Sequence, residues 1–127
     1  MDTLPALPEV FWLVVHSGPA DEIAELLAYA RDLRRLENRN DPIVVVSPIS
    51  PGEIDLGDAL HVDVYPATRL FARAARIVSA CGFNVMRQTF EHRDRHGYLP
   101  LPRRFDDQFA RAARRRATSV RGTGPTE

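Results

Sequence analysis

The stretch EVFWLVVH (Glu9–His16) is a continuous apolar run that ends at the turn residues Ser17-Gly18-Pro19. A run this short, rich in Val and aromatic residues, predicts a strand that is buried on both faces. Further short runs of the same character predict strands at Ile43–Val46, His61–Val64, Arg76–Ser79 and Tyr98–Leu101.

Helical patterns separate these runs. In Asp21–Leu36, apolar residues recur at helical spacing along one face, namely Ile23, Leu26, Leu27, Ala30, Leu33 and Leu36. The other predicted helices are Pro66–Arg73, Asn84–Glu91 and Asp107–Ala117, and a disordered tail is expected over 118–127. Short strands alternating with helices predict an α/β fold. We expect a single Rossmann-like domain over residues 1–117, with a mostly parallel sheet of about five strands and helices on both faces.

The composition is that of a globular domain. With 127 residues, 44% of them hydrophobic, the chain can bury a core without disulfides or metals, and its single cysteine, Cys81, excludes an internal disulfide. No segment reaches the roughly 18 consecutive apolar residues that cross a bilayer. The start, Met1–Val10, also lacks the basic region of a signal peptide. We therefore expect a cytoplasmic protein.

Charge is distributed unevenly along the chain, although 17 acidic residues balance 17 basic ones, all of them Arg. Residues 1–63 hold 12 acidic residues and 4 Arg, whereas residues 64–127 hold 5 acidic residues and 13 Arg. If the fold keeps these halves apart, the split favours an anionic partner on the C-terminal half or an electrostatic face toward another domain. If the fold interleaves them, the asymmetry disappears.

Ligands of parallel sheets bind at the carboxyl ends of the strands, which directs attention to the loops His16–Pro19, Ser79–Asn84 and Pro100–Gln108. In the second loop, Gly82 has no Cβ and so lets a ligand approach the backbone. The helix that follows offers unpaired N–H groups to a phosphate, and Gln88 lies further along it. The alternatives are an ordinary turn with Asn84 as N-cap and a solvated position for Gln88.

The third loop combines two Arg, two Asp and a Gln. Arg103 and Arg104 offer forked donors to phosphate oxygens, whereas Asp107 and Gln108 suit the vicinal hydroxyls of a sugar. The alternative is a capped surface helix that follows solvated Arg residues.

The first loop is expected to contribute less. Ser17 and Gly18 could supply a hydroxyl and a backbone N–H group. However, Asp21 and Glu22 in the next turn would repel a second phosphate, and a simple tight turn is the alternative.

Other chemistry is not indicated. His92 and His96 have i,i+4 spacing, but no third ligand lies nearby in an obvious pattern, so neither a zinc site nor a cofactor is expected. Cys81 has no evident base partner, and no Ser-His-Asp set stands out. The Arg residues of the last helix lack aromatic stacking partners, which favours a solvated helix face over a nucleic-acid partner.

Together, VYP (Val64–Pro66), IVSACGFN (Ile77–Asn84) and PLPRRFDDQ (Pro100–Gln108) resemble the C-terminal, donor-binding lobe of GT-B glycosyltransferases. The resemblance is greatest to the MurG-like group of glycosyltransferase family 28 and covers about residues 10–117. It implies a lobe that holds a nucleotide-sugar donor, usually a UDP-sugar.

The resemblance also implies roles for individual residues. The matched positions are Ser17 and Gly18 for the loop facing the phosphates, Val64 and Tyr65 for the base, Gly82, Phe83 and Asn84 for the pyrophosphate-binding helix start, and Asp107 and Gln108 for the donor sugar. Gln88 stands where the family usually has a Glu that bonds the ribose, so a charge-assisted hydrogen bond is lost there.

The function implied is that of the donor-binding half of a transferase that moves a hexosyl or N-acetylhexosaminyl group with inversion and without a metal. The general base is expected from an acceptor lobe, either a separate chain or one that has been lost, so no catalytic residue is assigned and the chain alone is expected to be inactive. Any membrane contact would arise through that partner. The competing interpretation is a non-catalytic nucleotide- or partner-binding Rossmann-like domain derived from a glycosyltransferase.

Overall fold

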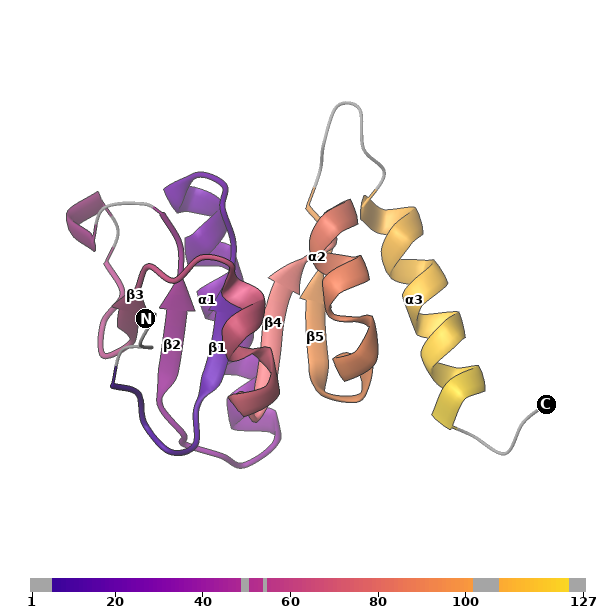
Figure 1. Cartoon of the computed structure of the whole chain (residues 1–127), viewed down its shortest axis with the longest axis horizontal. Coiled ribbons are helices and arrows are strands. Elements are labelled where there is room, and N and C mark those ends of the chain that lie inside the picture. The colour runs from indigo at the N-terminus through magenta and orange to yellow at the C-terminus, as the bar shows by residue number, and fades with distance from the viewer. Residues whose placement is uncertain (1–5, 49–50, 54, 102–107, 124–127) are drawn as a thin grey trace.

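The fold is a Rossmann-like α/β domain built on one five-stranded, all-parallel sheet with the order β3-β2-β1-β4-β5 (Figure 1). The computed structural model describes residues 6–48, 51–53, 55–101 and 108–123. The strands are β1 (Trp12–Val15), β2 (Ile43–Val46), β3 (Leu60–Val62), β4 (Arg76–Ala80) and β5 (His96–Leu99). The helices are α1 (Ala20–Leu36), α2 (Phe83–Gln88) and α3 (Gln108–Thr123), with 3-10 helices η1 (Pro51–Glu53), η2 (Ala67–Arg73) and η3 (Phe90–Arg95). The predicted fold class is confirmed.

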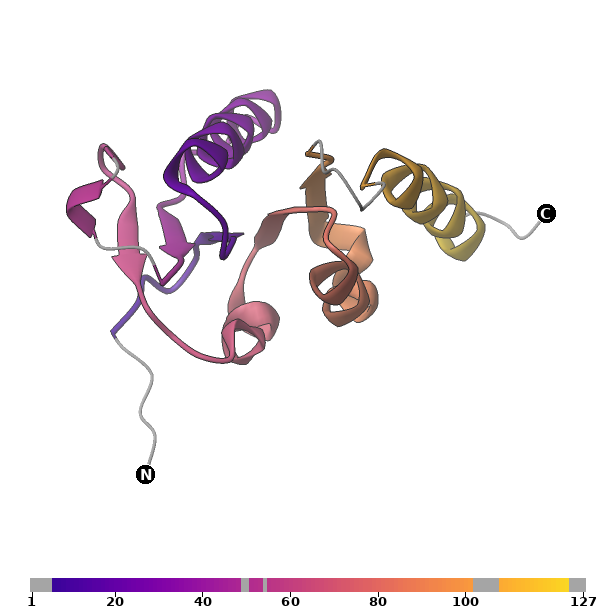
Figure 2. The ribbon, with the colours of Figure 1, turned by 90° about the horizontal axis from the view of Figure 1, so that it is seen from above.

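The continuous apolar run of β1 is explained by burial on both faces of the sheet. Trp12 and Val14 point into a core shared with α1, whereas Phe11 and Leu13 point into a second core shared with η2. Successive side chains of a strand alternate between the two faces, so a strand covered on both sides needs apolar residues throughout. Viewed from above, α1 and η2 lie on opposite sides of the sheet (Figure 2).

Helix α1 buries one face against the sheet through Ile23, Leu26, Leu27 and Ala30. It ends just before Asn38, which adopts a left-handed conformation with φ of 58°. The prediction that Leu36 belongs to the packed face is wrong, because this side chain is 82% exposed. Leu36 is the last residue of the helix.

The C-terminal third departs most from the predicted boundaries. Helix Asn84–Glu91 is instead two helices, α2 and η3, that meet at Thr89. The Thr89 hydroxyl donates to the Val85 carbonyl at 2.7 Å, a local bond that competes with continuation of the helix. Strand β5 begins at His96 rather than Tyr98, because the imidazole of His96 has hydrogen-bond partners in the interior.

Helix α3 continues to Thr123, past the predicted end at Ala117. The added residues include no Pro, and their only Gly is Gly122, so nothing in them breaks the helix earlier. Strands β1 and β3 are shorter than the runs that predicted them.

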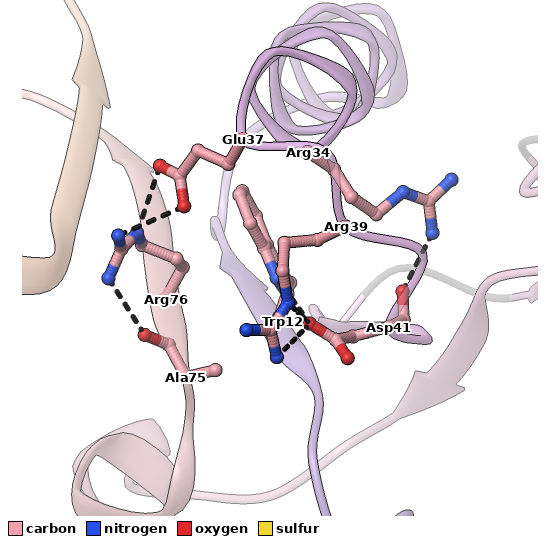
Figure 3. A network of polar contacts seen from close by, with 7 residues as sticks. All are labelled: Trp12, Arg34, Glu37, Arg39, Asp41, Ala75 and Arg76. Atoms are coloured by element: carbon pink, nitrogen blue, oxygen red, sulfur yellow. Dashed lines mark hydrogen bonds and ion pairs between the residues drawn. The ribbon is translucent and has the colours of Figure 1, made fainter.

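The amino ends of the strands are held by a polar network (Figure 3). The carboxylate of Asp41 accepts hydrogen bonds from the indole of Trp12 at 3.2 Å and from the Arg39 guanidinium at 2.9 Å. Arg76, at the start of β4, forms an ion pair with Glu37 at the end of α1, with an N–O distance of 2.9 Å. These contacts join the end of α1, the segment before β2 and the start of β4 at the amino ends of the strands.

The strand order keeps the two halves of the sequence largely apart. Residues 1–63 supply β3, β2, β1 and α1, whereas residues 64–127 supply β4, β5, α2 and α3. The exception is η2, which packs beneath β1 and β2. The acidic and basic halves of the sequence therefore become two sides of the molecule rather than being interleaved.

Candidate functional site

The loops after β1 and β4 start side by side. Val15, the last residue of β1, pairs with Ser79 of β4, and both strands point the same way. Starting from β1, strands β2 and β3 are added on one side of the sheet, whereas β4 and β5 are added on the other side. The direction of the strand order therefore reverses between β1 and β4. This is the position at which open α/β sheets bind ligands.

Gln108 joins the ends of β4 and β5. Its side-chain oxygen Oε1 accepts hydrogen bonds from the backbone N–H of Cys81 at 3.0 Å and from that of Leu101 at 2.9 Å. Gln108 itself is only 3% exposed. The described parts of Ser79–Asn84 and Pro100–Gln108 thus meet at the carboxyl ends of β4 and β5. The oxygen of Gln108, which the resemblance assigns to a donor sugar, is engaged with the backbone here.

Two Arg residues of α3 also face inward. Arg111 donates to the carbonyl of Cys81 at 2.6 Å. Arg115 is 6% exposed and donates to Nδ1 of His96 at 2.9 Å and to the carbonyl of Met86. The interpretation of the last helix as a solvated Arg face is therefore wrong for Arg115. The signal in the sequence was the spacing of Gln108, Arg111 and Arg115, which puts them on one side of a helix.

Ser79 and His96 form a buried pair beneath this edge. Nε2 of His96 lies 2.7 Å from Oγ of Ser79, which in turn donates to the Ala80 carbonyl at 2.8 Å. Since Arg115 donates to Nδ1, Nε2 carries the proton and donates to Ser79. Burial, and after it the positive charge of Arg115, lowers the pKa of His96 from 6.5 to about 3.

This pair is not a nucleophile and its base. A catalytic histidine is oriented by an acceptor, usually a carboxylate, whereas Arg115 is a cation that donates to the ring. Ser79 is completely buried, so no substrate carbonyl could reach its hydroxyl. The network of Ser79, His96 and Arg115 is structural.

The loop after β1 is covered by a contact between one of its own side chains and a side chain of α1. Nε2 of His16 lies 2.7 Å from a carboxylate oxygen of Glu22, in the first turn of α1. A Cβ built on Gly18 would lie 2.6 Å from each of these two atoms, so the pair packs directly against Gly18. A carboxylate at a helix start is favoured by the helix dipole and would repel a phosphate there. Ser17 remains exposed at the tip of the loop.

The other predicted residues lie in different environments. Val64 is 8% exposed and packs in the η2 core, whereas Tyr65, next to it after β3, is 90% exposed. Gln88 is exposed at the last residue of α2, roughly 9 Å along the helix from Gly82 at 1.5 Å per residue. The side chains of Phe83 and Asn84, and all of Arg103, Arg104 and Asp107, lie outside what the structure describes.

Comparisons with protein-family models, with curated proteins and with solved structures find no match for this chain. Within the described ranges, no three side chains of His, Cys, Asp or Glu gather as a metal site would require. The helices in the described part of the chain lack the length and apolar character needed to span a bilayer.

Proposed function

We propose that this chain is the donor-binding half of a glycosyltransferase and holds a nucleotide sugar, a UDP-sugar in the first instance, where β1 and β4 end. The observation that supports this most is the double hydrogen bond to Gln108. It brings the turn after β4 and the segment after β5 together at the edge of the sheet where such folds bind ligands.

Gly82 gives independent support. Its φ of −65° and ψ of 155° are open to any residue, and among the residues that the structure describes a Cβ there would meet nothing closer than Val85 Cγ1 at 3.8 Å. Within the described part of the chain, neither backbone conformation nor packing requires glycine at this position. A ligand that approaches the backbone closely is a sufficient reason for it.

In this proposal the ligand extends along the edge of the sheet. The diphosphate lies against the backbone at Gly82, and the exposed Gln88, further along α2, bonds the ribose. Backbone N–H groups and Arg side chains would stabilise the departing diphosphate electrostatically, without a metal. The general base would come from an acceptor lobe in another chain.

Calorimetry with UDP, UDP-glucose and UDP-N-acetylglucosamine tests the proposal, with ADP as a base control. We expect the Gly82→Ala variant to weaken UDP binding at least tenfold, and Gln88→Ala to weaken it about 2- to 10-fold, the effect of one lost hydrogen bond. Gly52→Ala is the matched control, because a Cβ at Gly52 meets no described atom within 4 Å. Absence of binding to every UDP compound by the folded protein would refute the proposal.

The contact between His16 and Glu22 favours a second candidate, a non-catalytic nucleotide- or partner-binding domain. The carboxylate of Glu22 occupies the start of α1, where many Rossmann-like domains place a phosphate. Mixing the chain with an acceptor lobe and a UDP-sugar distinguishes the candidates. Release of UDP that depends on both chains supports the enzyme, whereas nucleotide binding without turnover supports the second candidate.

A further inference from the structure

One face of α3 determines the geometry of the turn after β4. We call Gln108, Arg111, Ala112 and Arg115 the α3 contact face. Ala112 is completely buried and packs with Cys81 and Met86. The three polar members of the face all bond backbone groups in or next to the segment from Cys81 to Met86.

The α3 contact face bonds both backbone polar groups of Cys81, the N–H and the carbonyl. Its N–H donates to Gln108 at 3.0 Å, and its carbonyl accepts from Arg111 at 2.6 Å. Strand β4 ends at Ala80, so the sheet ladder does not fix these groups. The direction in which the chain leaves β4, and hence the position of Gly82, depends on side chains from α3.

We propose that Gln108 and Arg111 are positioning residues for the nucleotide site: they hold the Cys81–Gly82 turn in the conformation that receives the diphosphate. This inference rests on the function proposed above. Gln108 acts as an acceptor through a single oxygen, and Arg111 as a donor. Docking of α3 and binding of nucleotide are therefore coupled, and by thermodynamic linkage each strengthens the other.

Cys81 makes the docking of α3 measurable without any ligand. It is the single cysteine of the chain and is completely buried under Ala112 and Met86. A maleimide can modify the thiol only when the α3 contact face opens, so the labelling rate reports the equilibrium for opening. Saturating UDP is expected to slow labelling of the unmodified sequence.

The variants separate hydrogen bonding from simple packing. Gln108→Met keeps the volume but removes the acceptor, and we expect labelling to accelerate about 10- to 100-fold. UDP affinity should fall less, by about 2- to 10-fold, because α3 stays docked in most molecules and the turn loses only the hydrogen bond that positions it. Gln108→Glu keeps an acceptor oxygen and is expected to restore most of both properties. Arg111→Met, at a half-buried position, provides a second test of the donor, and Arg116→Ala, an exposed residue of the same helix, is the control that changes neither.

The possible outcomes distinguish failure of the positioning role from failure of the proposed function. Unchanged labelling in both Gln108→Met and Arg111→Met would overturn the positioning role, whatever the nucleotide result. Accelerated labelling with unaltered UDP affinity would overturn it as well, because the turn would then move without affecting the site. If the unmodified protein binds no nucleotide while Gln108→Met still accelerates labelling, the proposed function fails and the contact face stands.

Discussion

The buried histidine of β5 makes a quantitative prediction about acid stability. His96 lies 7% exposed between Ser79 and Arg115, with the ring of Tyr98 at a centroid distance of 5.2 Å. Ser79 already accepts from the neutral ring, and protonation would replace the hydrogen bond from Arg115 with repulsion between two cations in a buried site. Protonating His96 is therefore expected to favour the unfolded chain.

The sign and size follow from proton linkage. The pKa is about 3 in the folded protein against 6.5 for an unperturbed histidine, so the unfolded state binds more protons between these values. The contribution of His96 to stability is complete above pH 6.5 and is lost as the pH falls toward the folded value. Between pH 7.5 and 5.5 the free energy of unfolding should fall by roughly 1 kcal/mol from this residue.

Urea denaturation followed by circular dichroism at pH 7.5, 6.5 and 5.5 measures this loss. His96→Gln keeps one donor and one acceptor but cannot titrate, so it should remove most of the decline with pH. Ile23→Val is the matched control: it lowers stability by about 0.5–1.5 kcal/mol at every pH and keeps the decline. If His96→Gln and the unmodified protein lose stability in parallel between pH 7.5 and 5.5, the reasoning about this site is wrong.

Three further substitutions test other contacts by urea denaturation at neutral pH. Asp41→Ala should cost about 1–3 kcal/mol, because it leaves the donors of the amino-end network without their acceptor; a cost near zero would mean that water replaces it. Arg76→Ala should cost less than about 1 kcal/mol, since Arg76 and Glu37 each remain 36% exposed at the side chain and water screens the pair. Gly97→Ala should cost about 1–3 kcal/mol, because the added Cβ would lie 2.8 Å from Cδ1 of Leu33, and a neutral result would show that the Leu33 side chain rotates away at little cost.

The order and type of most elements could be predicted because their signals are local. Four-residue apolar runs such as Ile43–Val46 have few alternatives to a doubly buried strand, and the amphipathic pattern of α1 extends over four turns. The start of β5 could not be predicted in this way. His96 is polar and follows a charged segment, and its burial depends on Ser79 and Arg115, which are distant in sequence.

The candidate site was predictable only as a set of loops. Parallel strands place their carboxyl ends together, so the convergence of the loops after β4 and β5 follows from topology alone. The role of Gln108 does not, because an amide next to two Asp residues suggests a sugar ligand as readily as a backbone contact. Its partner Cys81 is 27 positions away, and only the packing of α3 brings them together. The same packing buries Arg115, which sequence composition assigned to the surface.

The separation of acidic and basic residues on the two sides of the sheet also affects how the protein behaves on charged matrices. Its formal net charge is zero, and a molecule with evenly mixed charges would pass both kinds of ion exchanger near neutral pH. This chain has β3, β2 and β1 on its acidic side and β4 and β5 on its basic side. At low ionic strength it should be retained on both anion and cation exchangers, each through a different side. Elution from both should occur as added salt shortens the screening length to about 10 Å at 0.1 M.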